Sequence, residues 1–230
     1  FAWQDMSQEG KVYGLPYYAD TQSFFYNEKI LQDAGISAPP ETWEELTEQA
    51  KTLQQRGMDE PFIIELDQSL PTITEVFTSM VFGRGGEMFD EEANPLWTDP
   101  ASPMAEQMHW LVDAANKDNI LTFVPHETDA VREMNTGRHA FTVLYNYNLA
   151  ELNNEARSDL AGQFKLAQMP GETHECYGFA KFYNMTQMAA DRGDSVVDAC
   201  GNFIEYFAGE TDGQYVVAKR WALESGLGFG

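Results

Sequence analysis

Polar and aromatic side chains follow several of the predicted strands in this sequence, at the points where the strands end. Those that could contact a small ligand are Tyr18, Asp20, Gln68, Thr72, Thr74, Tyr145, Asn146 and Tyr147. Flat aromatic rings can cover the apolar face of a pyranose, while carboxylate and amide groups hold its hydroxyls. Carboxylates make the stronger of these hydrogen bonds because they are charged. The residue types therefore indicate non-covalent recognition of a hydroxylated solute.

Each of these side chains also has a purely structural interpretation. Asp20 could cap a turn, as aspartate often does. Gln68, Thr72 and Thr74 could simply cap the helix that follows them, although the start of that helix could also donate N–H groups to a ligand oxygen. Within the segment from Tyr145 to Tyr147, one side chain would face a ligand while the others cap the next helix.

Motifs for catalysis or metal binding are not apparent. A pair of carboxylates can hydrolyse a glycoside, but 37 acidic residues produce many chance pairs, so their number decides nothing. The four histidines lack metal-ligand spacing, and the sequence has neither a G-x-S-x-G motif nor a P-loop. The acidic segment from Asp90 to Asp99 is an alternative calcium site, although it lacks the EF-hand pattern. We expect no cofactor, no metal and no catalytic residue.

Composition excludes several classes of function. The chain has 230 residues, a net charge of −23 and a pI of about 4.3. Such a surface repels phosphate backbones, so we expect no nucleic-acid partner. No apolar run approaches the roughly 18 residues that cross a bilayer. The chain opens at Phe1 without a signal peptide, as if cut from a longer protein. Cys176 and Cys200 could form one disulfide or remain two thiols.

Short apolar strands alternate with amphipathic helices along the chain, which is typical of the α/β class. The predicted strands cover residues 11–15, 23–26, 62–66, 140–144, 164–168 and 177–183, with a break at Pro16. The predicted helices cover residues 27–34, 42–57, 74–82, 102 or 103 to beyond 115, 128–137, 148–156, 195–207 and 213–223. Thr42 has capping-box spacing to the glutamate three residues later, and Thr128 should cap its helix. Trp43, inside the first of these helices, is expected to pack in the core, as are Phe24 and Phe25.

Four stretches of the chain resemble one known family, the family 1 bacterial extracellular solute-binding proteins, which are maltose-binding-protein-like components of ABC importers. GKVYGLPYYADTQSFFYNEKIL (10–31) resembles the first crossover between their two lobes, and APPETWEELTEQAKTL (38–53) the helix that follows. MNTGRHAFTVLYNYNLAEL (134–152) resembles the strand that delivers an aromatic residue to the ligand cleft. MPGE (169–172) and then YGFAKFYN (177–184) resemble the second crossover. The four stretches occur in the family's order over nearly the whole chain.

The resemblance implies a two-lobed α/β fold of the periplasmic-binding-protein type II kind, of which this chain holds a part. Residues 1–17 would end the N-terminal lobe and form the first crossover. Residues 18–168 would form most of the C-terminal lobe, and residues 169–230 would return to the N-terminal lobe. On this interpretation half of the ligand cleft lies outside the chain.

The resemblance also implies roles for individual residues. Asp20 lies at the crossover, where the family places an acidic or polar ligand residue, and Tyr18 is close to it. Tyr147 falls where a family member has a tryptophan that stacks on the sugar. This sequence departs from that member in having tyrosine there and in lacking the usual glycine after the strand, so the ligand could differ. Tyr177 to Phe179 could also reach the cleft.

The family captures solutes by closing two lobes around them and then docks on a membrane permease. We therefore expect a monomer in the periplasm or outside the cell, with or without a lipid anchor, that binds a carbohydrate and serves ABC permease subunits. A polyol or a glycerophosphodiester is the alternative ligand. Two other hypotheses remain: a sensor domain, and a carbohydrate-active enzyme, which would need two acids about 5–10 Å apart.

Overall fold

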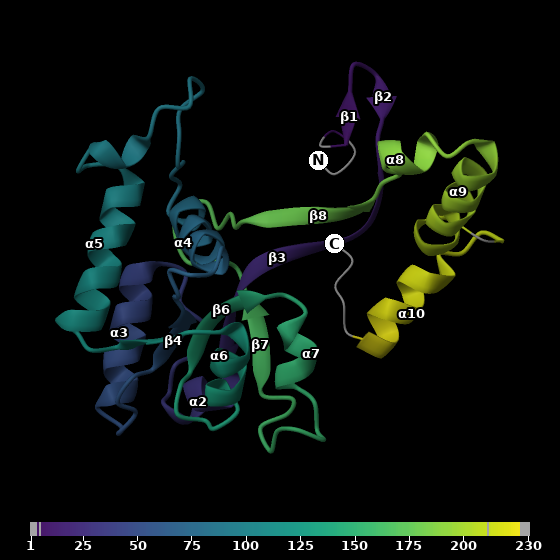
Figure 1. Cartoon of the computed structure of the whole chain (residues 1–230). Coiled ribbons are helices and arrows are strands. Elements are labelled where there is room, and N and C mark those ends of the chain that lie inside the picture. The colour runs from purple at the N-terminus through teal and green to yellow at the C-terminus, as the bar shows by residue number, and fades with distance from the viewer. Residues whose placement is uncertain (1–3, 5, 211, 226–230) are drawn as a thin grey trace. The chain divides into compact units, whose positions relative to one another are not determined.

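The computed structural model describes residue 4, residues 6–210 and residues 212–225 of the chain (Figure 1). Phe1, the residue at which the sequence opens, lies outside these residues. The chain falls into two compact units. Unit 1 comprises residues 1–20 and 178–230, and unit 2 comprises the continuous stretch 21–177.

Unit 2 is built on one mixed β-sheet. Its strands are the later part of β3 (Leu15–Asn27), β4 (Phe62–Glu65), β5 (Leu121–Val124), β6 (Phe141–Tyr145) and β7 (Phe164–Ala167), and their spatial order is β5, β4, β6, β3, β7. β4 is parallel to β5 and β6, whereas β3 is antiparallel to β6 and β7. The carboxyl ends of β4, β5, β6 and β7 therefore meet at one edge of the sheet.

Helices cover both faces of this sheet, and every residue of β4 and β6 is buried between them (Figure 1). One face packs against α3 (Trp43–Gln54), α4 (Thr72–Gly83) and α5 (Pro103–Asn116), and the other against α6 (Glu127–Met134) and α7 (Asn148–Leu152). This layering confirms the predicted α/β class. Within the described ranges, no helix is long and apolar enough to span a bilayer.

Aromatic rings dominate the larger core cluster of unit 2, between the sheet and helices α3 to α5. The Trp43 ring is fully buried, with its centroid 6.4 Å from those of Phe24 and Phe62 and 4.9 Å from that of Trp110. The indole N–H of Trp110 donates a hydrogen bond of 3.1 Å to the Trp43 carbonyl. Phe25, on the opposite face, is also fully buried. The packing roles predicted for Trp43 and the two phenylalanines are confirmed.

The strands predicted at residues 62–66, 140–144 and 164–168 are confirmed to within one residue at either end. β5 was not predicted. It is a four-residue edge strand in which Leu121 is buried while Phe123 is 45% exposed. Such a short run directly after a long amphipathic helix has too few residues for its period of two to be recognised.

The predicted break at Pro16 is wrong. β3 runs through this residue, whose fixed φ is compatible with extended backbone near the start of a strand. The turn lies earlier, where β1 (Ser7–Gln8) and β2 (Lys11–Val12) form an antiparallel hairpin. Glu9 and Gly10 between them have φ of 52° and 76°, and positive φ at both central residues is what a two-residue type I′ hairpin requires.

Of the two helix caps predicted from the sequence, one is confirmed and the other is wrong. The Thr42 hydroxyl accepts a hydrogen bond of 3.0 Å from the N–H of Glu45, as the capping box predicts. The Glu45 carboxylate reaches one residue further back than predicted, to the N–H of Glu41 at 2.8 Å. The predicted cap at Thr128 is wrong, because α6 begins at Glu127 with His126 at its N-cap position, which leaves Thr128 within the first turn.

The glycine of the MPGE stretch is explained by a close approach of two backbone segments. Gly171 has a φ of 134°, and a Cβ atom at this position would lie 2.1 Å from the carbonyl oxygen of Gly83 at the end of α4. Nearby, Thr173 donates from its N–H to the Gly83 carbonyl at 3.0 Å and from its hydroxyl to the Phe82 carbonyl at 2.6 Å. Any side chain at residue 171 would force these segments apart.

Unit 1 contains the β1–β2 hairpin, the start of β3 and β8 (Gly178–Tyr183), which pairs with β3. It also contains α8 (Gln187–Ala190), α9 (Asp194–Ala208) and α10 (Val216–Ser225). No residue of α9 is buried by the described part of the chain, and Phe203 in this helix is 54% exposed. Unlike the cores of unit 2, the aromatic residues of α9 form a partly exposed cluster, in which the Phe207 ring contacts Tyr183 of β8 and Trp221 of α10.

Candidate functional site

The carboxyl edge of the sheet in unit 2 carries the larger group of polar side chains. β4 ends at Glu65 and β6 ends at Tyr145, while Glu127 begins α6 just after β5. The strand order β5, β4, β6 places these three strand ends side by side. In open α/β sheets, ligands bind outside the carboxyl ends of the strands. This edge is therefore the candidate site of unit 2.

Two tyrosines at this edge are stacked and tied to carboxylates. The ring centroids of Tyr145 and Tyr147 lie 5.6 Å apart, with an angle of 13° between the ring planes. The Tyr145 hydroxyl donates to the Glu75 carboxylate, and the Tyr147 hydroxyl donates to Glu127 at 2.9 Å. The Asn148 amide also donates to Glu127. These bonds fix the orientation of both rings.

The two tyrosines differ in exposure. Tyr145 is the last residue of β6 and is buried, whereas the sequence placed it just beyond the strand. Tyr147 is half-buried and lines, with Glu127, a surface pocket of about 620 Å³ between α6 and α7. Asn146 between them donates its backbone N–H to the Thr21 carbonyl at 3.0 Å. Of this segment, Tyr147 presents the ring that a ligand can reach.

The three candidate residues before and within α4 lie in different surroundings. Thr72 is the first residue of α4, and its hydroxyl donates to the Glu65 carboxylate at 2.5 Å. Gln68 is exposed in the preceding turn, and Thr74 is exposed in the first turn of the helix. The helix therefore begins two residues earlier than predicted, with Pro71 rather than one of these side chains at the N-cap position. Only Thr72 joins the carboxylates at the sheet edge.

Glu65 was not singled out from the sequence, although it is the polar residue within the predicted strand FIIEL and the last residue of β4. It is buried, and burial raises the pKa of its carboxyl group. The hydrogen bond from Thr72 and the charge of His126 oppose this rise, while the nearby charges of Glu75 and Asp67 add to it. The net direction is upward, so an ionised Glu65 costs stability in the folded protein.

Replacement of Glu65 by glutamine is expected to raise the thermal midpoint of the ligand-free protein by a few degrees at pH 7. A carboxyl whose pKa is raised by folding contributes stability that is fully present below its unfolded pKa of about 4.3 and is lost as pH rises through the folded pKa. The advantage of Glu65→Gln should therefore vanish at pH 4. Thermal unfolding at both pH values measures it, with Glu48→Gln on the exposed side of α3 as the control. A variant less stable than the wild type at pH 7 would contradict this account of Glu65.

The candidate residues of unit 1 lie where β3 pairs with β8. The side chain of Asp20 is only 2% exposed, and its Oδ2 atom lies 3.6 Å from the Nζ atom of Lys181. The Lys181 ammonium donates a hydrogen bond to the Tyr18 hydroxyl. The same Nζ atom lies 4.6 Å from the centroid of the Tyr18 ring and 5.3 Å from that of Phe179. Lys181 thus connects the predicted residues Tyr18 and Asp20, although it was not itself predicted.

The three groups influence each other's ionisation. Burial raises the pKa of Asp20, and the nearby Lys181 and Tyr18 groups oppose this without reversing it. Burial also raises the pKa of Tyr18, against the hydrogen bond from Lys181. For Lys181, burial alone would lower the pKa, but the contacts with Tyr18 and Asp20 outweigh it and the net direction is upward. Lys181 is therefore protonated at neutral pH.

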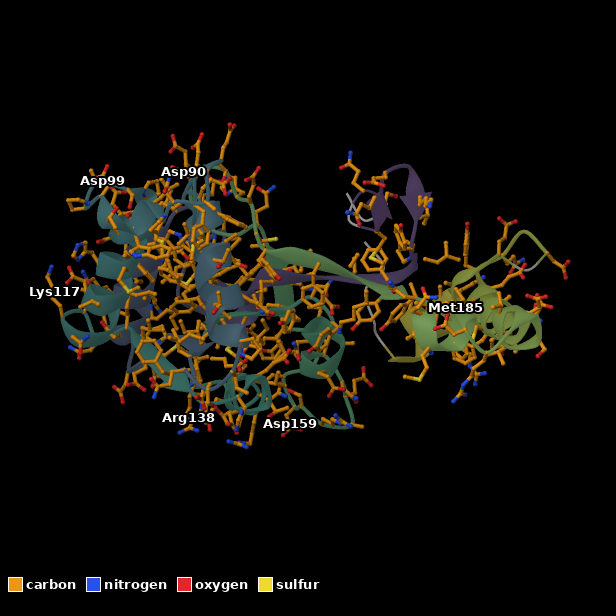
Figure 2. All side chains as sticks on the ribbon, turned by 45° about the horizontal axis from the view of Figure 1, so that its top comes forward. Asp90, Asp99, Lys117, Arg138, Asp159 and Met185 are labelled. Atoms are coloured by element: carbon orange, nitrogen blue, oxygen red, sulfur yellow. The ribbon has the colours of Figure 1, made fainter. Side chains whose placement is uncertain are left out.

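In the acidic segment that was considered as a calcium site, the first carboxylate, that of Asp90, stabilises its own turn. Asp90 accepts hydrogen bonds from the N–H groups of Glu92 at 3.0 Å and Asn94 at 2.7 Å, and so closes its own turn. Asp90 and Asp99 lie at the periphery of unit 2 (Figure 2). In the part of the chain that the structure describes, no three His, Cys, Asp or Glu side chains gather as a metal site requires.

Both cysteines are free thiols in the structure. Cys176, in unit 2, packs against the larger core cluster, and burial raises the pKa of its thiol, with a smaller contribution from the charge of Glu175. Cys200 lies in α9 of unit 1. A buried thiol with a raised pKa is a poor nucleophile, so Cys176 is a packing residue.

Comparison with known proteins places this arrangement in a family. Residues 2–172 match the family described as bacterial extracellular solute-binding protein. The chain is similar to the arabinooligosaccharide-binding protein of Halalkalibacterium halodurans, with 25% identity over 169 residues that cover 71% of this chain. The same alignment covers 36% of that relative, so the chain spans little more than a third of its length.

The chain is also similar to solved structures that have the same fold. Maltose-bound MalE3 of T. maritima has a TM-score of 0.82 at 18% identity, covering 99% of this chain and 57% of that one. A solute-binding protein of Agrobacterium radiobacter in complex with ribitol has a TM-score of 0.76 at 16% identity, covering 96% of this chain and 54% of that one. At these identities the likeness establishes the fold, which is the predicted periplasmic-binding-protein type. Because the family match extends over well more than half of its residues, the chain belongs to the bacterial extracellular solute-binding protein family.

Proposed function

We propose that this chain carries ligand-binding elements of the solute-binding component of an ABC importer, and that the solute is a neutral carbohydrate. One observation carries the proposal. Tyr145 and Tyr147 are stacked, and their hydroxyls are tied to Glu75 and Glu127 at the carboxyl edge of the sheet. A fixed aromatic surface next to hydrogen-bond acceptors matches the two needs of a sugar, an apolar face to cover and hydroxyls to bind.

The charges at this edge favour a neutral ligand over an anionic one. Its buried or partly buried acids are Glu65, Glu75 and Glu127, with His126 near Glu65. Arg132 and Arg157 also line the pocket beside Tyr147, but each is paired with an acid, Asp129 and Glu151 respectively. A phosphodiester would be repelled by this group of carboxylates, whereas sugar hydroxyls can donate to them. The named ligands of three similar proteins, arabinooligosaccharide, maltose and ribitol, are hydroxyl-rich and uncharged, whereas a fourth similar protein is named with glycerophosphocholine. We therefore place sugars first, polyols second and glycerophosphodiesters last.

The proposed role is capture for transport and not catalysis. The family consists of extracellular solute-binding proteins, which deliver small molecules to permease subunits of ABC importers. Membership supports a location in the periplasm or outside the cell. Capture by closure of two lobes, a monomeric state and a lipid anchor stay predictions from the resemblance.

A thermal-shift screen of the full-length protein tests the proposal. Maltose, arabinotriose, ribitol and glycerophosphocholine serve as probes, because a ligand that binds only the folded state raises the unfolding midpoint by mass action. A ligand at 100 times its Kd adds about 2.7 kcal/mol to the stability. A saturable rise with a neutral sugar is the expected result. A rise with glycerophosphocholine alone would overturn the carbohydrate assignment, and no rise with any probe would count against the proposed function.

A further inference from the structure

Where β3 pairs with β8, the Lys181 side chain is accessible to solvent and the Asp20 side chain is not. The lysine side chain is 43% exposed, whereas the Asp20 side chain is 2% exposed. The Oδ1 atom of Asp20 is buried as well and has no hydrogen-bond partner among the described residues. The resemblance implies that Asp20 contacts the ligand, but its carboxylate is buried, whereas the ammonium group of Lys181 is accessible. In the structure, the accessible group is therefore Lys181, whereas the group that the resemblance implies is Asp20.

The contacts of Lys181 hold its ammonium group in one place. It donates to the Tyr18 hydroxyl and lies 3.6 Å from Asp20 Oδ2, close enough for an ion pair. The centroids of the Tyr18 and Phe179 rings lie 4.6 and 5.3 Å from Nζ, within the range of cation–π contacts. An ammonium has three N–H donors, and the two contacts with Tyr18 and Asp20 leave one that can point to solvent. Lys181 is therefore a positioned donor with remaining capacity.

We propose that Lys181 binds the ligand directly in unit 1, donating a hydrogen bond to a hydroxyl oxygen of a neutral sugar or polyol, and that Asp20 is a positioning residue that acts through Lys181. The inference rests on the proposed function. Asp20 fixes the ammonium group and offsets its charge, so the pair as a whole does not attract anions. The Phe179 ring beside Nζ offers an apolar surface next to the donor, as sugar recognition requires.

Acidity should act on binding through Asp20. Its pKa is raised by burial, and protonation removes the charge that holds Lys181 in place. The other titratable groups at this position are Lys181 on β8 and Tyr17 and Tyr18 on β3, and the pKa values of Lys181 and Tyr18 are both raised, away from the acid range. Burial also raises the pKa of Glu65 in unit 2. The contribution of Asp20 is therefore measured by comparing the pH dependence of affinity in Asp20→Asn with that in the wild type. The pH dependence of the wild type alone does not isolate it.

Isothermal titration of the full-length protein with maltose, arabinotriose and ribitol tests the proposal. Lys181→Met should weaken binding by about 10- to 100-fold, the loss of one hydrogen bond to a charged group. Lys181→Arg, which keeps the charge and donors, should recover part of the affinity. Asp20→Asn should lose less than Lys181→Met and should remove part of the decline in affinity as the pH falls from 7.5 towards the ordinary aspartate pKa of about 4. Lys165→Met, on an exposed position of β7, is the matched control and should bind like the wild type.

The outcomes separate the inference from the proposed function. Wild-type affinity in Lys181→Met, or a larger loss in Asp20→Asn than in Lys181→Met, would overturn the assignment of Lys181 while leaving the protein a binder. Absence of binding by the wild type with all three probes would instead contradict the proposed function, and the inference with it. A thermal midpoint near that of the wild type confirms that a variant is folded. Such a midpoint is expected for the Lys181 variants, because Lys181 is not part of a core.

Discussion

Replacement of Tyr147 by alanine is expected to weaken binding of a neutral sugar by about 30-fold, since truncation of an aromatic anchor at a binding site costs about 2 kcal/mol. Tyr147 is the half-buried member of the stacked tyrosine pair, and its hydroxyl is held by Glu127 at 2.9 Å. The thermal midpoint of the ligand-free protein should change little, because the ring lines a surface pocket. Isothermal titration with the sugar that raises the midpoint most in the thermal-shift screen measures the effect.

Two variants show whether the ring itself is responsible. Tyr147→Phe keeps the ring and removes only the hydrogen bond to Glu127, so its loss of affinity should be much smaller than that of Tyr147→Ala. Tyr13→Ala removes a tyrosine that is exposed and distant in the sequence, and should have no effect. Equal affinities of Tyr147→Ala and the wild type would remove the stacked pair from the binding site.

Trp43→Ala is expected to lower the free energy of unfolding by about 3–5 kcal/mol, which is the usual cost of deleting a large buried aromatic side chain. The Trp43 ring is fully buried and contacts rings from two strands and from α5. Its removal leaves a cavity that the surrounding strands cannot fill, because β4 and β6 are buried on both faces. Urea unfolding of wild type and variant, followed by circular dichroism, gives the difference.

Trp97→Ala is the matched control for this measurement. Trp97 is 46% exposed and contacts the ring of Phe89, also exposed, at 5.4 Å between centroids. Its loss should cost less than about 1 kcal/mol, as surface substitutions do. Similar losses in the two variants would mean that Trp43 does not anchor the core of unit 2. The folded fraction of Trp43→Ala should still bind sugar, which separates a stability effect from a site effect.

The core of unit 2 could be predicted because its sequence signals are local. FIIEL and AFTVL are continuous apolar runs, as expected of strands buried on both faces, and they form β4 and β6. Thr42 and Asn27 cap their helices through bonds to N–H groups three residues away. The break at Pro16 was predicted wrongly because a local preference was outweighed by pairing along a 13-residue strand. Local signals thus placed most elements but not the full length of β3.

The arrangement of the candidate site could not be predicted in the same way, since its contacts are distant in the sequence. The Tyr145–Glu75 bond joins residues 70 positions apart, and the Tyr18–Lys181 bond joins residues 163 positions apart. Resemblance to the family supplied Tyr147 and Asp20 as candidates, but not the carboxylates that orient the tyrosines. Nor did it supply the burial of Asp20, which depends on how β3 and β8 pair. Only the folded chain brings Lys181 to its partners.

The central claim is that the protein binds a neutral sugar reversibly and leaves it unchanged. The most direct measurement is isothermal titration of the full-length protein with the sugar selected by the thermal-shift screen, followed by chromatography of the recovered sugar. We predict saturable heat at one sugar per chain and recovery of the sugar intact. Absence of saturable heat with every neutral sugar would contradict the claim of binding, and recovery of cleaved sugar would favour a carbohydrate-active enzyme instead.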